Sequence, residues 1–197
     1  MRLVCLAALV WFFTQPGLAQ SAEYGLPKPH YHSQLGEPPW LARLAELHGH
    51  LGPWAVSGCR LGTVGLRRVG AVGYFDVEVT CEGPLAKPPR SCFLDGLQVG
   101  TGATLGKRNL HWQEANELVV RVRNVRTGQV AEVRPTAQLH ALLSSVQLQP
   151  RAAGSKPPDD RRARATQSSK EDPAEVVARR IAAMSDEQIC TVKVSSQ

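Results

Sequence analysis

The chain is poor in aromatic residues, which make up 6% of its 197 residues, and in charge, since Asp, Glu, Lys and Arg make up 20%. It has no lysine- and arginine-rich run interleaved with aromatics, the pattern typical of nucleic-acid-binding surfaces. After the first 19 residues it also has no apolar run of about 20 residues, the length that a transmembrane helix needs. The net charge of +6 is a modest basic excess. We therefore expect neither nucleic-acid binding nor a membrane span in the mature chain.

Nucleotide and serine-hydrolase motifs are absent as well. In the glycine-rich segment 100–109, a phosphate loop would need glycine where Thr101 stands and Ser or Thr where Arg108 stands. A dinucleotide fingerprint in the same segment would need glycine where Leu105 stands. No G-x-S-x-G nucleophile elbow occurs anywhere. These absences argue against nucleotide enzymes and serine hydrolases.

The N-terminus has the order of a secretory signal peptide. Arg2 precedes the apolar residues 3–13, and small residues ending in Ala19 follow. The apolar run is too short to span a bilayer, and this order is typical of a cleaved signal. We expect residues 1–19 to be removed and the mature protein to be exported, either to a periplasm or out of the cell.

Of the five cysteines, Cys5 lies within the predicted signal. Export permits disulfides, and the other four cysteines can pair in three ways. Their spacing matches no paired C-x-x-C zinc motif. A Cys81–Cys92 bridge is the pairing to test first, and a free Cys92 stays open.

The mature chain divides into four parts by composition. Residues 20–38, rich in Pro, Gly, His and Gln, predict a flexible arm without regular structure. Residues 39–148 carry helix and strand patterns. Residues 149–172 contain charge but no large apolar side chain, and predict a disordered insertion. Residues 173–197 predict a helix and a last strand that complete the same single domain.

Apolar periodicity predicts the elements of that domain. Helices are expected to begin near Pro39, Pro53 and Thr136, and another to cover residues 91–100. A strand is expected over residues 74–80, and strands 118–126 and 129–134 should form a hairpin through Thr127-Gly128.

Three glycines lie on one side of the helix that begins at Pro53, namely Gly58, Gly62 and Gly65. A stripe of small residues lets another element approach closely, so this helix should be central and tightly packed. An exposed stripe would favour a partner protein or a second copy of the chain, as in a homodimer, whereas a buried one would not.

Residues 91–110 carry the strongest candidate for a site. Cys92, Asp95 and Gln98 share one face of the predicted helix. The glycine loop that follows carries Thr101, Thr104, Lys107 and Asn109, whose side chains can donate, accept or hold a charge. A capped helix followed by an ordinary turn explains the same pattern.

A second candidate is the segment H-G-H-L-G-P, residues 48–53. On a regular helix His48 and His50 would point about 200° apart, but on an extended or turning segment they fall on one side. Gly49, Gly52 and Pro53 break the helix, so a shared site is open. Two capping histidines are the alternative. His30 and His32, in the arm, are expected to be surface decoration rather than ligands.

In this order, H-G-H-L-G-P, C-F-L-D-G-L-Q and T-G-A-T-L-G-K-R-N-L resemble the formylmethanofuran dehydrogenase E-subunit family, from about residue 39 to 148. The resemblance implies an α+β fold, with helices packed on one face of a mixed or antiparallel sheet. It also implies a metal, usually zinc, bound by the His-Gly-His segment and cysteines. Two of the family's cysteines are replaced, by Gly52 and Ala103.

The resemblance leaves His48, His50 and Cys92 as metal ligands, with one position open for water or a ligand, and Asp95 to orient a histidine. We therefore expect an exported domain that binds zinc or a small anionic ligand between the His-Gly-His turn and the helix and loop 92–109. Whether it is an enzyme stays open, and the methanofuran-linked activity is not inferred. The alternatives are a non-catalytic interaction or scaffold protein with a degenerate metal site, and a metal-free pocket lined by His48, His50, Gln98 and Lys107. The ligand-binding residues are expected to be Asp95, Gln98, Thr101, Thr104, Lys107 and Asn109.

Overall fold

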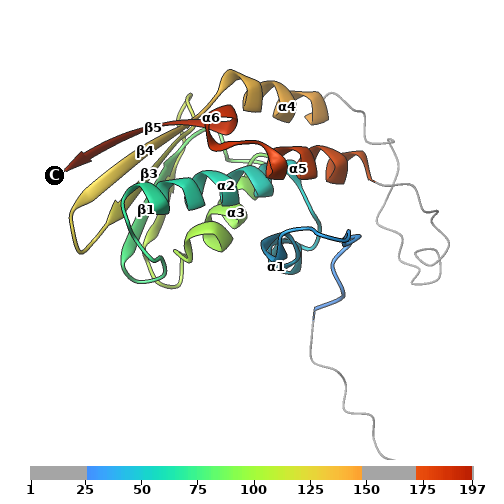
Figure 1. Ribbon diagram of the computed structural model, residues 1–197, viewed down its shortest axis with the longest axis horizontal. Coiled ribbons are helices and arrows are strands. Elements are labelled where there is room, and N and C mark those ends of the chain that lie inside the picture. Colours follow the sequence, from blue (N-terminus) through green and yellow to red (C-terminus); the bar gives the residue numbers. More distant parts are fainter. Residues whose placement is uncertain (1–25, 148–171, 197) are drawn as a thin grey trace, which may run out of the picture.

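The computed structural model describes residues 26–147 and 172–196 (Figure 1). The predicted signal peptide and nearly all of the predicted charged insertion lie outside these residues. The described residues form a single α+β domain with a five-stranded mixed sheet, which confirms the expected fold class. No helix in them is long and apolar enough to cross a membrane.

The strands of the sheet are ordered β2-β1-β3-β4-β5. β1 pairs with β2 in parallel, and the other neighbours are antiparallel. The predicted hairpin is confirmed as β3 and β4, with Gly128 at a positive φ of 74° in the turn. The strand bounds are β1 Val77–Glu82, β2 Leu110–Gln113, β3 Val119–Asn124, β4 Gln129–Pro135 and β5 Cys190–Ser196.

The strand predicted over residues 74–80 begins late, at Val77. The Asp76 carboxylate accepts hydrogen bonds from the backbone N–H groups of Val72 (2.9 Å) and Gly73 (2.7 Å). This side chain closes a turn, in which Tyr74 has a φ of 60° and Phe75 is 78% exposed. The alternation of Phe75 with Val77 and Val79 therefore does not describe one buried face.

Figure 1 shows the helices gathered on one side of the sheet. The other face carries ion pairs between neighbouring strands, including Arg121 with Glu82 and Glu132. The apolar face and the helices together enclose the core. The helix bounds are α1 Pro39–His48, α2 Pro53–Arg68, α3 Cys92–Thr101, α4 Ala137–Gln147, α5 Pro173–Ala183 and α6 Asp186–Ile189.

The glycines of α2 let this helix touch α3 backbone to backbone. A Cβ added at Gly58 would lie 2.0 Å from the carbonyl oxygen of Phe93, and one at Gly96 would lie 1.9 Å from that of Ala55. A Cβ at Gly65 would lie 2.4 Å from a methyl carbon of Val122 in the sheet. The stripe is therefore buried within the chain, as a tightly packed central helix requires, and it offers no surface to a second copy.

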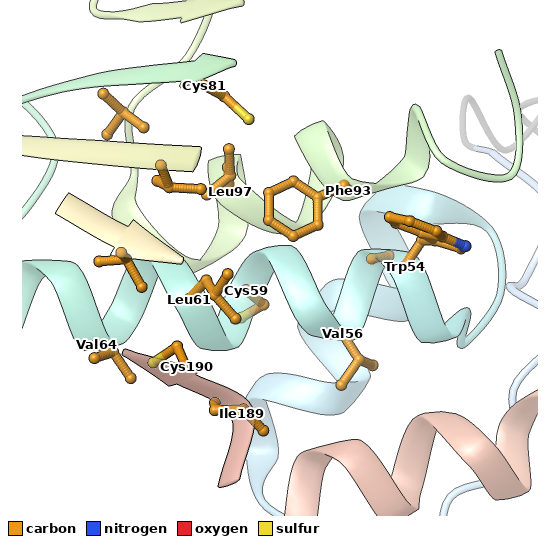
Figure 2. Close-up of a cluster of buried hydrophobic side chains, with 14 of the residues drawn as sticks. Trp54, Val56, Cys59, Leu61, Val64, Cys81, Phe93, Leu97, Ile189 and Cys190 are labelled. Carbon is orange, nitrogen blue, oxygen red and sulfur yellow. The ribbon is translucent and has the colours of Figure 1, made fainter. Parts of the chain in front are cut away.

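Three cysteines lie in the core that α2 and α3 form (Figure 2). Burial raises the pKa of Cys59 to about 11, of Cys81 to about 12 and of Cys190 to about 11. All four cysteines in the described residues are free thiols, so of the two alternatives left open by the sequence, a Cys81–Cys92 bridge and a free Cys92, the structure has the second. Cys81 points from β1 into the core, whereas Cys92 opens α3 and is half-buried.

Residues 26–38 contain no helix and no strand longer than a single bridge, but they make specific contacts. The Tyr31 hydroxyl donates to Glu37 at 2.5 Å, and the Arg179 guanidinium of α5 pairs with Glu37 and donates to the carbonyl of His32. The His30 N–H donates to the Gly49 carbonyl at 2.8 Å. The described part of the predicted arm, residues 26–38, is thus anchored to α5 and to the His-Gly-His turn.

Candidate functional site

The His-Gly-His turn forms where α1 ends. Gly49 caps the helix in the left-handed region, with a φ of 85°, and its N–H donates to the Ala45 carbonyl at 2.7 Å. This conformation favours glycine, which has no Cβ to clash. Because the chain leaves the helix at Gly49, the His48 and His50 side chains lie on the same side of the turn, with their ring centroids 4.5 Å apart. The broken helix therefore brings the two imidazoles together, which a continuous helix could not do.

Asp95 of α3 holds the first of these rings. Its Oδ2 lies 2.7 Å from His48 Nδ1, and the His48 side chain is only 8% exposed. The hydrogen bond to Asp95, together with the adjacent Cys92, raises the pKa of His48 to about 9, although burial acts in the opposite direction. Asp95 thus fixes the orientation of the ring, and the metal-free protein carries an imidazolium here at neutral pH.

The other ring nitrogen of His48 has no partner. Its Nε2 is buried and makes no hydrogen bond within the described residues. A Cβ added at Gly52 would lie 3.6 Å from this atom and 3.2 Å from His50 Nε2. Both Nε2 atoms therefore face the same small residue, at the position where the family pattern has a cysteine.

A pocket of about 510 Å³ adjoins this turn. Its volume is within the range of small-molecule sites. Its polar wall comes from the end of α1 and from α3, where Gln98 Nε2 lies 3.5 Å from Asp95 Oδ1. Its apolar wall includes residues of the glycine loop and β2. The lining residues are His48, Pro88, Ser91, Cys92, Leu94, Asp95, Gln98, Leu105, Leu110 and Trp112.

Three polar residues at the end of α3 and in the glycine loop have structural partners. The Thr101 hydroxyl donates to the Leu97 carbonyl at 2.6 Å. Asn109 accepts from the Thr104 N–H at 3.0 Å and donates to the carbonyls of Tyr74 and Val77. None of the three lines the pocket. The Thr101 and Asn109 side chains therefore satisfy backbone groups of α3, of the start of β1 and of the loop itself.

Lys107 lies on the same loop, and it too is absent from the pocket lining. Its Nζ lies 3.4 Å from the Thr104 hydroxyl, 6.0 Å from the centroid of the Tyr74 ring and 5.7 Å from that of Phe75. The ammonium is thus held over two exposed aromatic rings. Of the predicted site residues, the structure groups His48, His50, Cys92, Asp95 and Gln98. It places Thr101 at the end of α3, and Thr104, Lys107 and Asn109 in the loop that follows.

Sequence reasoning missed the apolar half of the pocket. Leu105 is 74% exposed and Trp112 is 40% exposed. The Trp112 indole N–H donates to the Gly83 carbonyl at 3.3 Å, which fixes the ring at the edge of the sheet. The available signal was an aromatic residue in the otherwise polar stretch H-W-Q-E.

The residues present fit a metal ion in part. The unpartnered Nε2 of His48 and the convergent Nε2 of His50 are suitable nitrogen donors, because Asp95 already occupies Nδ1 of His48. However, within residues 26–147 and 172–196 no three His, Cys, Asp or Glu side chains lie close enough to hold a metal as they stand. Cys92 adjoins His48, so it is the thiol available as a third ligand once the side chains rearrange around an ion.

Fold and site define a single α+β domain with a pocket between a helix end and a sheet edge. A family model described as FmdE, molybdenum formylmethanofuran dehydrogenase operon, matches residues 47–191, more than half of the chain. The chain therefore belongs to the FmdE family, as its three motifs indicated, and this family is associated with metal binding. No curated protein sequence matches the chain.

Proposed function

We propose that the mature chain is an exported binding domain that holds a zinc ion through His48, His50 and Cys92 and takes a small anionic molecule into the adjacent pocket. The observation that carries the proposal is the buried, unpartnered Nε2 of His48. A buried nitrogen without a partner costs about 1–3 kcal/mol, and a metal bond would offset this cost.

Asp95 prepares His48 for this role. Because the carboxylate accepts from Nδ1–H, the lone pair of the neutral ring is on Nε2, which faces His50 and Gly52. Metal binding must displace a proton, since Asp95 and Cys92 raise the pKa of His48 to about 9. Affinity for metal should therefore increase with pH up to about 9.

The set of donors suggests an open coordination position. Gly52 and Ala103 supply no thiol, so two imidazoles and one thiolate are the protein ligands available. Three protein ligands leave one position of a tetrahedral zinc ion for water or for an anion. A bound zinc ion would polarise an anionic or carbonyl ligand and lower the pKa of a bound water to about 7. Gln98, beside Asp95, can donate to a molecule in the pocket.

Zinc titration tests the proposal. The chelator-stripped mature protein is titrated against a chromophoric zinc indicator, alongside Cys92→Ser, His48→Gln and the control His111→Gln on the exposed edge strand β2. We expect about one equivalent in the wild type, at least a ~10-fold loss of affinity in the two site variants and no change in the control. Less than about 0.2 equivalents in the wild type, or equal affinities in all four proteins, would refute zinc binding at this site.

One observation favours a second candidate. Since the described residues hold no ready group of three metal-binding side chains, the site could be a degenerate one in a scaffold or interaction protein. In that case the protonated His48 supplies the charge for a small anion without metal. Failure of zinc binding combined with saturable anion binding, lost in His48→Gln, would favour this candidate.

Export is a separate part of the proposal, supported by Arg2, the apolar residues 3–13 and the small residues ending in Ala19. Mass spectrometry of the protein expressed with its own N-terminus should show a chain beginning at Gln20 in the periplasmic or culture fraction. A full-length chain that retains Met1 in the cytoplasm would refute it.

A further inference from the structure

A second cavity, of about 490 Å³, lies outside the site described above. Its wall is built from five separate segments: the start of α2, the loop before α3, the residues before β3, the end of β4 and one face of α4. It shares no lining residue with the first pocket. The loop before α3 contributes Arg90 to this cavity, and Pro88 and Ser91 to the other.

The wall of this cavity carries two arginines and one carboxylate. Arg90, Arg134 and His140 line it, and Glu117 is the one carboxylate among its lining residues. The Arg134 guanidinium pairs with Glu117 at 2.8 Å and with Glu132 at 2.9 Å. The Glu117 side chain is 78% exposed, so the Arg134–Glu117 pair is accessible to solvent. The Arg90 guanidinium has no hydrogen-bond or ion-pair partner among the residues that the structure describes. Arg90 is therefore available to an anion.

The apolar part of the wall contains an unsatisfied donor. Trp54 is 7% exposed, and its buried indole N–H has no acceptor within the described residues. In Figure 2 the indole nitrogen points away from the Phe93 ring and hence out of the core cluster. Leu118 and Leu143 line the cavity next to it. A buried N–H without an acceptor is costly, and a ligand oxygen would satisfy it.

We propose that this cavity binds a small organic carboxylate. The carboxylate pairs with Arg90, since a guanidinium matches a planar oxyanion with two parallel hydrogen bonds. The apolar body of the ligand lies against Leu118, Leu143 and the Trp54 ring. The indole N–H donates to a ligand oxygen at the inner end of the cavity. This site does not depend on metal binding at His48.

The indole N–H of Trp54 reports binding directly by NMR. Its resonance is assigned with Trp54→Phe, and the wild type is titrated with benzoate and, at matched ionic strength, with inorganic phosphate. We expect a saturable shift with benzoate and none with phosphate, because phosphate lacks the apolar body. Arg90→Gln should weaken benzoate binding at least ~10-fold, since it removes the charge-assisted hydrogen bonds to the carboxylate.

Arg180→Gln is the matched control, because Arg180 is an exposed arginine of α5 outside both pockets, and it should bind benzoate as the wild type does. Three results would overturn the proposal: no shift of the Trp54 resonance at about 10 mM benzoate, equal binding by Arg90→Gln, or a phosphate-induced shift as large as that with benzoate. Since Arg90 is exposed, its replacement should leave the fold intact, which the remaining indole and amide resonances will show.

Discussion

Asp95→Asn removes the negative charge of the carboxylate whose Oδ2 lies 2.7 Å from His48 Nδ1, but it keeps a side chain of nearly the same shape. The Asn carbonyl can still accept a hydrogen bond from Nδ1–H, so the change removes charge more than contact. In the metal-free protein we expect the pKa of His48 to fall from about 9 toward the ordinary histidine value of about 6.5.

The pKa shift of His48 sets an upper limit on the free energy of unfolding that the Asp95–His48 pair contributes. A pKa raised from 6.5 to about 9 corresponds to at most ~3.4 kcal/mol, at about 1.4 kcal/mol per unit. Part of the shift comes from Cys92, and the Asp95 side chain is 40% exposed, so that solvent screens the pair. We therefore expect the variant to lose about 1–2 kcal/mol of stability where His48 is charged in both states.

The stabilisation that Asp95 gives to the folded protein should decrease as pH rises. Because the folded-state pKa of His48 lies above the unfolded value, the stabilisation is complete below about 6.5 and is lost as pH rises through about 9. Denaturant unfolding in the presence of chelator should show the full difference between wild type and Asp95→Asn at pH 6. At pH 10 the difference should shrink to a few tenths of a kcal/mol.

Glu114→Gln is the matched control, because Glu114 is an exposed carboxylate without an ion pair among the described residues. It should change stability by less than about 0.5 kcal/mol at both pH values. An equal loss of stability at pH 6 and pH 10 in Asp95→Asn, or a His48 resonance that titrates as in the wild type, would refute the ion pair.

Three further substitutions test the packing and the site. Gly58→Ala should destabilise the protein by about 3 kcal/mol or more in denaturant unfolding, because the new Cβ would lie 2.0 Å from a carbonyl oxygen of α3. Gly106→Ala is the control and should be nearly neutral, because its Cβ would meet nothing nearer than 3.9 Å. Gly52→Cys should raise zinc affinity at least ~10-fold in the indicator titration, because its Cβ would lie 3.2 Å and 3.6 Å from two imidazole nitrogens; unchanged affinity would mean that the rings do not form a metal site. Arg179→Met should cost about 3–5 kcal/mol in thermal or denaturant unfolding, because it removes the guanidinium that pairs with the buried Glu175 at 3.1 Å and leaves the exposed His32, at 3.4 Å, beside that carboxylate. A loss below about 1 kcal/mol would count against this pairing.

The sequence predicted the elements whose residues repeat with a strong period. The glycines and apolar residues of α2 and the face of α3 that carries Cys92, Asp95 and Gln98 occur as expected. β2 was not predicted, because it has four residues, of which three are exposed, and so shows no alternation of burial. A short edge strand takes its pairing from its neighbour rather than from its own pattern.

In the candidate site, the sequence predicted a pairing that is familiar from metal sites: a histidine oriented by a carboxylate from another helix, as His48 is by Asp95. Thr101 and Asn109 look the same in sequence whether they bind a ligand or satisfy backbone groups, and in the structure their side chains bond to backbone atoms of α3, of β1 and of the loop. The second cavity had no sequence signal, because its walls come from segments as distant as Trp54 and His140. Such a site exists only after the sheet has brought those segments together.

The central claim is that a zinc ion is held at the His-Gly-His turn. Anomalous diffraction at the zinc edge, from crystals of the mature protein grown with zinc, tests it most directly. One strong peak is predicted within about 2.0–2.3 Å of His48 Nε2, His50 Nε2 and the Cys92 sulfur. No anomalous peak at the turn, or a zinc ion bound only elsewhere on the chain, would contradict the account.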